Sequence, residues 1–319
     1  MRSRIGRVVA RHSPAGDSCI GRAEVHARNI IKWAFDYRGE RGPISRRYQF
    51  AVLRRITKTL LVQKDGIVYF VDGRDNVIGR ATYSYGSFEK EYMDLAISLV
   101  REYCGDVITD KVIVDVGANI GTFTVPALIR YGARKVVAFE PSPNNAFYLR
   151  VNVAANDLND RVDIREIALS NEEGSFDLEL SPDNWGDHRI RMSNAGGRFG
   201  EDRRETISVP VATLATSDLD NDLGLIWMDT QGHEGHVLAG GADNLQVPVV
   251  TEYWPYALER AGGSALMHDV IASRFESIID IRATASRNSP VVFPAKSIGL
   301  LYESLSPSGS TDLVLVPFK

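Results

Sequence analysis

The sequence has few of the residues that build disulfide-rich or metal-stapled proteins. Its 319 residues include two cysteines, Cys19 and Cys104, which stand far apart and outside any CxxC or Cys/His cluster. A disulfide framework and a structural zinc site are therefore not indicated, and a cytoplasmic location is expected. No apolar run reaches the roughly eighteen residues that a membrane helix needs, so we also expect no membrane span.

Internal repeats and low-complexity tracts are absent as well. Hydrophobic residues make up 44% of the chain and charged residues 24%, which is typical of a globular protein. A chain of this length can bury one large core with additions, or two small ones.

Acidic residues are scarce in the first sixty positions, where fourteen Lys and Arg face four Asp and Glu, a net charge of +10 against −4 for the whole chain. Such a basic arm could meet phosphate, nucleic acid or an anionic membrane surface, or its cations could simply face water. The apolar residues of 24–38 recur at helical spacing. We therefore expect a basic, mostly helical extension at 1–60, through which the chain could oligomerise, and one main domain at 61–319.

The pattern of residues between 60 and 110 predicts a small set of strands and a helix at the start of this domain. Apolar and polar residues alternate from 60 to 86 around DG and GRDN turns, which predicts short antiparallel strands. Ser87 could cap the helix that the following FEKEYMDLAISLVREY predicts.

After residue 110, apolar strands alternate with helices. This alternation predicts an α/β fold with a mainly parallel sheet covered by helices on both faces. Thr124 is expected to cap the helix TVPALIRYG, with Pro126 in its first turn. The expected strands are KVIVDV, KVVAFE, VDIREIAL, LGLIWMD, VPVVTEYW and the final TDLVLVP.

Two of these strands end in residues suited to a nucleoside. The first strand leads to Gly117, where the backbone can turn tightly and approach a ligand. The second ends at Glu140, whose carboxylate can accept hydrogen bonds from both hydroxyls of a ribose. A dinucleotide fingerprint would need glycines where Asn119 and Thr122 stand. The pattern therefore favours a nucleoside ligand over NAD.

Four segments together resemble the successive motifs of FkbM-type S-adenosylmethionine-dependent methyltransferases, and the resemblance extends over about residues 65–318. These segments are DVGANIG at 115–121, FEPSPNN at 139–145, IALSNEEG at 167–174 and WMDTQGHEGHVLAGG at 227–241. The resemblance implies a Rossmann-like class I methyltransferase fold and S-adenosyl-L-methionine as the cofactor.

The resemblance also implies roles for individual residues. Glu140 would hold the ribose, Ala168 would lie beside the adenine, and Asp229 would stand where the methyl group is presented. The methionine part of the cofactor would be surrounded by Asp115, Gly117, Asn119 and Gly121. Relatives commonly have Val-Glu-Gly after the aspartate, whereas this chain has Thr230, Gln231 and Gly232.

Methyl transfer to an alcohol requires alignment of donor and acceptor and a group that takes the proton. His233 and Glu234 are the candidate bases, with Asp229, His188 and Glu252 as further candidates; His233 could instead cap the next helix. No metal ion is expected at the site.

The long polar stretch at 181–206 predicts a lid over the substrate or cofactor, or else a solvated excursion between two strands.

The resemblance favours a small-molecule or glycan acceptor, with the methyl group going to a hydroxyl of a sugar, glycolipid or secondary metabolite. A nucleic-acid methyltransferase is an alternative. Enzymes that methylate exocyclic amines resemble one another in an Asn/Asp-Pro-Pro-aromatic motif at the fourth strand, whereas this chain has the sequence DTQG there, which argues against this alternative. A non-catalytic nucleoside-binding module is the other alternative.

Overall fold

The computed structural model describes residues 42–219, 222–241, 245–305 and 309–318, all within a compact unit at Gly39–Lys319. The helix predicted at 24–38 and most of the basic arm lie outside these residues. Within the described ranges, no helix is both long and apolar enough to cross a lipid bilayer.

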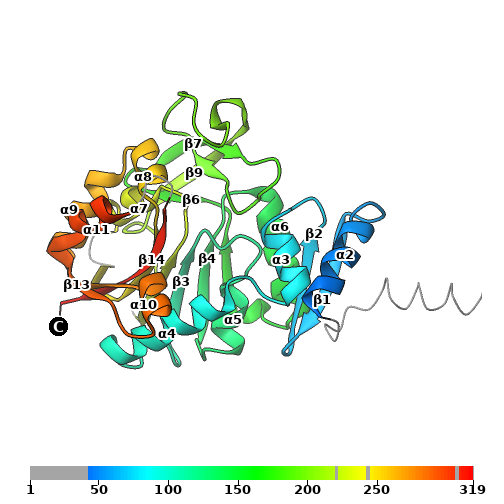
Figure 1. Cartoon of the computed structure of the whole chain (residues 1–319), viewed down its shortest axis with the longest axis horizontal. Helices are drawn as coiled ribbons and strands as arrows, with labels where there is room; N and C mark the ends of the chain where they lie inside the picture. Colours follow the sequence, from blue (N-terminus) through cyan, green and yellow to red (C-terminus); the bar gives the residue numbers. More distant parts are fainter. Residues whose placement is uncertain (1–41, 220–221, 242–244, 306–308, 319) are drawn as a thin grey trace, which may run out of the picture. The chain divides into compact units, whose positions relative to one another are not determined.

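The centre of this unit is an eight-stranded sheet with the strand order β13-β12-β14-β11-β10-β3-β4-β5 (Figure 1). The five strands from β11 to β5 are parallel, and β14 runs antiparallel between β11 and β12. This arrangement confirms the predicted mainly parallel sheet. The strands are β3 (Val112–Val116), β4 (Lys135–Phe139), β5 (Val162–Arg165), β10 (Leu223–Met228), β11 (Val249–Tyr253), β12 (Phe275–Asp280), β13 (Val292–Pro294) and β14 (Thr311–Pro317).

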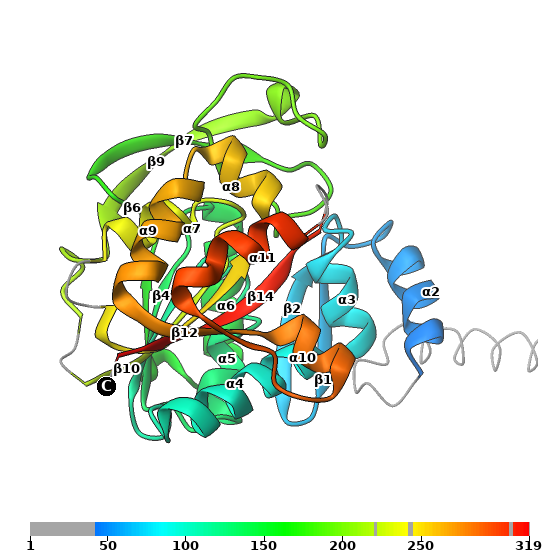
Figure 2. The ribbon, with the colours of Figure 1, turned by 60° about the vertical axis from the view of Figure 1, so that its left-hand side comes forward.

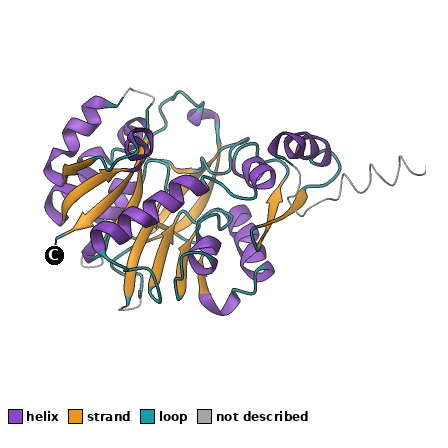
Figure 3. Ribbon diagram, turned by 60° about the horizontal axis from the view of Figure 1, so that its bottom comes forward, coloured by secondary structure: helices purple, strands orange, loops and turns teal. Residues whose placement is uncertain are grey.

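Helices cover both faces of the sheet, as predicted (Figures 2 and 3). On one face Met267 packs into a core with Val114. Because side chains alternate along a strand, Asp115 points to the opposite face, where it accepts a hydrogen bond from Thr124. The helices are α2 (Pro43–Leu53), α3 (Ile78–Tyr85), α4 (Lys90–Cys104), α5 (Thr124–Ile129), α6 (Pro143–Ala155), α7 (Glu234–Ala239), α8 (Pro255–Ala261), α9 (Ser264–Arg274), α10 (Ile281–Arg287) and α11 (Ile298–Ser304).

A second, four-stranded sheet has the order β6-β9-β7-β8 and lies at the top of Figure 1. Its strands are β6 (Ala168–Ser170), β7 (Gly174–Leu180), β8 (Arg189–Ile190) and β9 (Glu205–Thr213). The hairpin of β1 (Thr59–Lys64) and β2 (Ile67–Asp72) precedes the main sheet, as predicted.

Two strand predictions were wrong. VDIREIAL forms two strands, because β5 pairs with β4 in the main sheet whereas β6 leaves it to pair with β9. Residues 78–85 form helix α3 instead of a strand. The carboxylate of Asp75 accepts hydrogen bonds from the backbone N–H groups of Val77 and Gly79, and Gly86, at φ +78°, ends the helix.

Two predicted helix caps were also wrong. Helix α4 begins at Lys90 with Glu89 as its N-cap residue, so Ser87 does not cap it. Helix α5 has Phe123 at its N-cap, and Thr124 uses its hydroxyl to donate to Asp115 at 2.5 Å. Pro126 still lies in the first turn, where its missing N–H costs little.

Candidate active site

The loop after β3 brings the backbone against the loop after β10. Gly117 has φ +85°, and a Cβ atom at this position would lie 1.9 Å from the carbonyl oxygen of Asp229. Only glycine fits such a position without moving the neighbouring chain. The two loops therefore meet at one point at the carboxyl edge of the sheet, where ligands bind in open α/β folds.

Glu140 lies at the end of β4, and its side chain is buried. One of its carboxylate oxygens accepts the backbone N–H of Asn119 and the other accepts that of Ser142, both at 2.8 Å. Burial raises the pKa of Glu140 to about 7, although these two hydrogen bonds favour the ionised form. Each carboxylate oxygen has a second lone pair, so the group can still accept hydroxyl donors from a ligand.

A first cavity, with about 540 Å³ of empty space, opens beside Glu140. The loops after β3, β4 and β10 form its floor, and the second sheet contributes Ala168, Leu178 and Ile190. Apolar walls with a few polar groups are typical of sites for small ligands, and this combination suits an adenine ring with its ribose at Glu140.

A second cavity, with about 770 Å³ of empty space, adjoins the first. Both are lined by Gly117, Asn119, Gly186 and Asp229. Aromatic side chains form part of its wall, among them Trp227, which stacks on Phe123 with ring centroids 4.0 Å apart. The two cavities are therefore neighbours that share the residues of the Gly117–Asp229 contact.

Carboxylates gather on the floor of the second cavity. Gln231 links two of them, because its amide nitrogen donates to Asp229 at 2.6 Å and to Glu252 at 2.9 Å. Asp312 faces Glu252 across the β11–β14 pairing and forms an ion pair with Arg282 at 2.7 Å. Gln231 therefore takes a linking role that the sequence alone did not indicate.

Burial, and after it the crowding of these acids, raises their pKa values. Burial, aided by Asp229, Glu234 and Asp312, raises the pKa of Glu252 well above its ordinary value. Asp229 is open to the cavity, yet the protein around it excludes bulk water and, with Glu234 nearby, raises its pKa to about 7. The cavity floor therefore holds carboxyl groups that titrate near neutral pH.

One oxygen from each of Asp229, Glu234 and Glu252 lies within 4.8 Å of the others, a spacing that could hold a cation. However, Glu234 already accepts hydrogen bonds from the backbone N–H groups of Thr230 and Gly232 and from the Thr230 hydroxyl. Glu234 thus stabilises the conformation of the loop after β10. The absence of a metal ion stays a prediction.

The candidate histidines lie on the first cavity. His233 is buried, its Nε2 atom lies 2.9 Å from the hydroxyl of Ser170, and its ring stacks on His236. Burial lowers its pKa to about 3. His188 accepts the backbone N–H of Ser181 at 3.0 Å, and burial lowers its pKa to about 4. His233 is the N-cap residue of α7 by position, but its side chain caps no N–H group.

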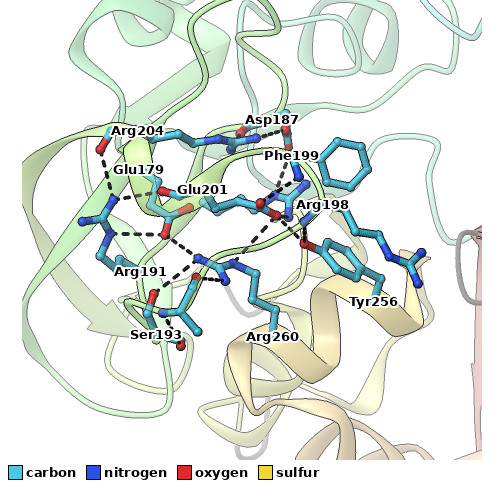
Figure 4. A network of polar contacts seen from close by, with 12 residues as sticks. Glu179, Asp187, Arg191, Ser193, Arg198, Phe199, Glu201, Arg204, Tyr256 and Arg260 are labelled. Atoms are coloured by element: carbon cyan, nitrogen blue, oxygen red, sulfur yellow. Dashed lines mark hydrogen bonds and ion pairs between the residues drawn. The ribbon is translucent and has the colours of Figure 1, made fainter.

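Residues 181–206, the predicted lid, carry a network of buried charges (Figure 4). Glu201 is fully buried, accepts a hydrogen bond from Tyr256 of α8 at 2.7 Å and pairs with Arg189 at 3.1 Å. Arg204 pairs with Asp187 at 2.6 Å. These contacts tie the segment to itself and to α8, and its movement as a lid stays a prediction.

Comparison with known proteins identifies the class to which this fold and site belong. The methyltransferase FkbM domain family matches residues 115–278, just over half of the chain. The 2-O-methyltransferase NoeI of Sinorhizobium fredii is 29% identical over 160 residues, 45% of this chain and 63% of that protein. The tRNA wybutosine-synthesizing protein 2 homolog of Rattus norvegicus is 31% identical over 137 residues, 40% of this chain and 29% of that protein.

A solved structure of M. jannaschii TYW2 in complex with AdoMet superposes with a TM-score of 0.38 at 14% identity, covering 81% of this chain and 84% of that one. The chain spans less than two thirds of each curated relative named above.

The chain thus belongs to the FkbM methyltransferase domain family. The predicted family membership is confirmed, and so is the predicted cofactor, S-adenosyl-L-methionine. The residues at the sheet edge fit this molecule, because an apolar cavity with Glu140 in it opens onto a second cavity rich in carboxylates.

Proposed function

We propose that the protein methylates a hydroxyl group of a neutral acceptor, which binds in the second cavity. The observation that carries the proposal is the junction of the two cavities at Gly117 and Asp229. S-adenosylmethionine supplies an electrophilic methyl group on a positively charged sulfur. With the nucleoside in the first cavity and its ribose at Glu140, Asp229 is the side chain at the passage to the acceptor.

A carboxylate of the second cavity is the proposed base. A base works best when its pKa lies near the operating pH, and Asp229 has a pKa of about 7. Glu252 lies deeper in the same cavity and shares the Gln231 amide with Asp229. His233 is the weaker candidate, because a pKa of about 3 makes a poor proton acceptor and its ring lines the first cavity.

The charge of the second cavity supports a neutral acceptor. Glu89, Asp115, Asp229, Glu252 and Asp312 line it. A phosphate or carboxylate on the acceptor would be repelled by these groups wherever they are ionised. A sugar, glycolipid or secondary-metabolite hydroxyl meets no such penalty, and the similarity to NoeI, a 2-O-methyltransferase, supports transfer to oxygen.

An acceptor screen tests the proposal. The protein is incubated with methyl-labelled S-adenosylmethionine and with neutral glycosides, glycolipids, small phenols or tRNA, and the products are analysed by mass spectrometry. We expect a gain of about fourteen mass units in a neutral hydroxyl compound. Asp229→Asn should lose most of this product, and the exposed Glu173→Gln serves as the control for loss of a carboxylate elsewhere. Label in tRNA would overturn the proposed acceptor class and support the nucleic-acid alternative.

A further inference from the structure

Helix α2 carries an apolar stripe that no other part of the described chain covers. Ile44, Tyr48, Val52 and Ile56 are 74%, 70%, 46% and 77% exposed. Their spacing of four residues places the three helical members on one face, and Ile56 continues the row just beyond the helix end. The opposite face carries Phe50 and Leu53, which are buried where α2 meets α3.

The charged residues in the segment that carries this stripe are all basic. The segment from Pro43 to Lys64 contains six Lys or Arg residues and no Asp or Glu. Arg47, Arg55 and Lys58 are exposed beside the apolar side chains. Apolar side chains flanked by cations are the pattern of helices that lie in the interface of an anionic bilayer.

A second copy of the chain and a nucleic acid both fit this face of α2 less well than a membrane surface does. In a symmetric dimer the same surface meets itself, so the cations of one α2 would oppose those of the other without an acid between them. A nucleic acid would satisfy the cations but would leave exposed isoleucines such as Ile44 and Ile56 against phosphate. An anionic lipid surface satisfies both features, since head groups pair with the cations and the acyl boundary takes up the apolar side chains.

We propose that the outer face of α2 binds the protein to anionic membranes as a peripheral protein. The surface consists of the stripe Ile44, Tyr48, Val52 and Ile56 with Arg47, Arg55 and Lys58. Binding here requires no membrane span, and none is found among the described helices. The proposal does not rest on the proposed reaction, and it can be tested without knowing the acceptor.

Vesicle sedimentation of the full chain tests this proposal. Vesicles of phosphatidylcholine are compared with vesicles that also contain about one third phosphatidylglycerol, at low and high salt. We expect binding to the anionic vesicles only, weakened by salt. The double variant Ile44→Ser/Ile56→Ser should weaken binding at least about tenfold. Arg55→Gln/Lys58→Gln should lose about fivefold for each cation.

The matched control is Leu300→Ser/Phe318→Ser, which removes apolar side chains that are 68% and 57% exposed elsewhere. It should bind like the wild type, and all variants should keep the wild-type melting temperature. Three results would overturn the proposal: no binding to anionic vesicles, unchanged binding by the isoleucine double variant, or a dimer in solution that this variant dissociates.

Discussion

A mutational test of ligand binding at Glu140 requires glutamine rather than alanine as the replacement. Replacement by alanine would leave the buried N–H groups of Asn119 and Ser142 without their acceptors. Each unsatisfied buried donor costs about 1–3 kcal/mol, so Glu140→Ala should lose about 2–6 kcal/mol of folding free energy. That is a large part of the stability of a typical domain, so this variant confounds ligand binding with unfolding.

Glu140→Gln separates the two effects. The glutamine keeps one acceptor oxygen and nearly the same volume, so the loss of stability should be about 1–3 kcal/mol. Its charge is lost, and with it the charge-assisted hydrogen bonds to the ribose hydroxyls, each worth about 1.5–3 kcal/mol. Loss of the equivalent of one such bond weakens binding at least about tenfold.

Calorimetric titration with S-adenosylmethionine measures this change on protein whose folding is confirmed by circular dichroism. The exposed Glu173→Gln is the control and should bind normally. A folded Glu140→Gln variant with wild-type affinity would refute the reasoning, because Glu140 would then be only a scaffold for the two loops.

Further predictions concern turnover, stability and the segment 181–206. Asp229→Asn should lower turnover by about 10² to 10⁴, whereas His233→Ala should keep turnover within about tenfold and melt earlier; the reverse ranking in steady-state assays would identify His233 as the base. Burial raises the pKa values of Asp115 and Glu140 to about 7, so above pH 4 the folded, ligand-free protein should bind more protons than the unfolded chain. Its folding stability should therefore fall as the pH rises through 7, and thermal melting at pH 5 and pH 8 measures this fall. An equal or higher melting temperature at pH 8 would contradict the prediction. Glu201→Gln removes one of the two carboxylate partners of both Arg189 and Arg260, which keep Asp187 and Glu179, so we expect a loss of about 1–3 kcal/mol and faster proteolysis of 181–206; unchanged cleavage would show that the network does not hold the segment.

Local patterns were enough to predict the elements that carry the candidate cofactor site. Continuous apolar strands ending at Val116 and Phe139, followed by Gly117 and Glu140, specify a parallel sheet and its ligand-binding edge. The hairpin before them follows from its DG turn. These features depend on neighbours in sequence, so a single sequence contains them.

The floor of the second cavity depends on partners far apart in the chain. Glu252 and Asp312 meet because β14 enters the sheet antiparallel to β11, and no local pattern fixes that position. The bridge from Gln231 to two carboxylates depends on a left-handed backbone, with φ +55° at that residue. Helix α3 was missed for a different reason: the signals that set its ends, Asp75 and Gly86, are local, but the alternation between them is typical of a strand.

The most direct test of the proposed reaction is the identity of the atom that receives the methyl group. The protein is incubated with S-adenosylmethionine labelled with ¹³C in its methyl group and with extract from its source, and the labelled product is isolated for NMR. The proposal predicts a labelled methyl carbon attached to oxygen in a neutral acceptor, and loss of most of that signal in Asp229→Asn. A labelled methyl carbon on nitrogen or carbon of a nucleic-acid base, or no transfer by protein that binds the cofactor, would contradict it.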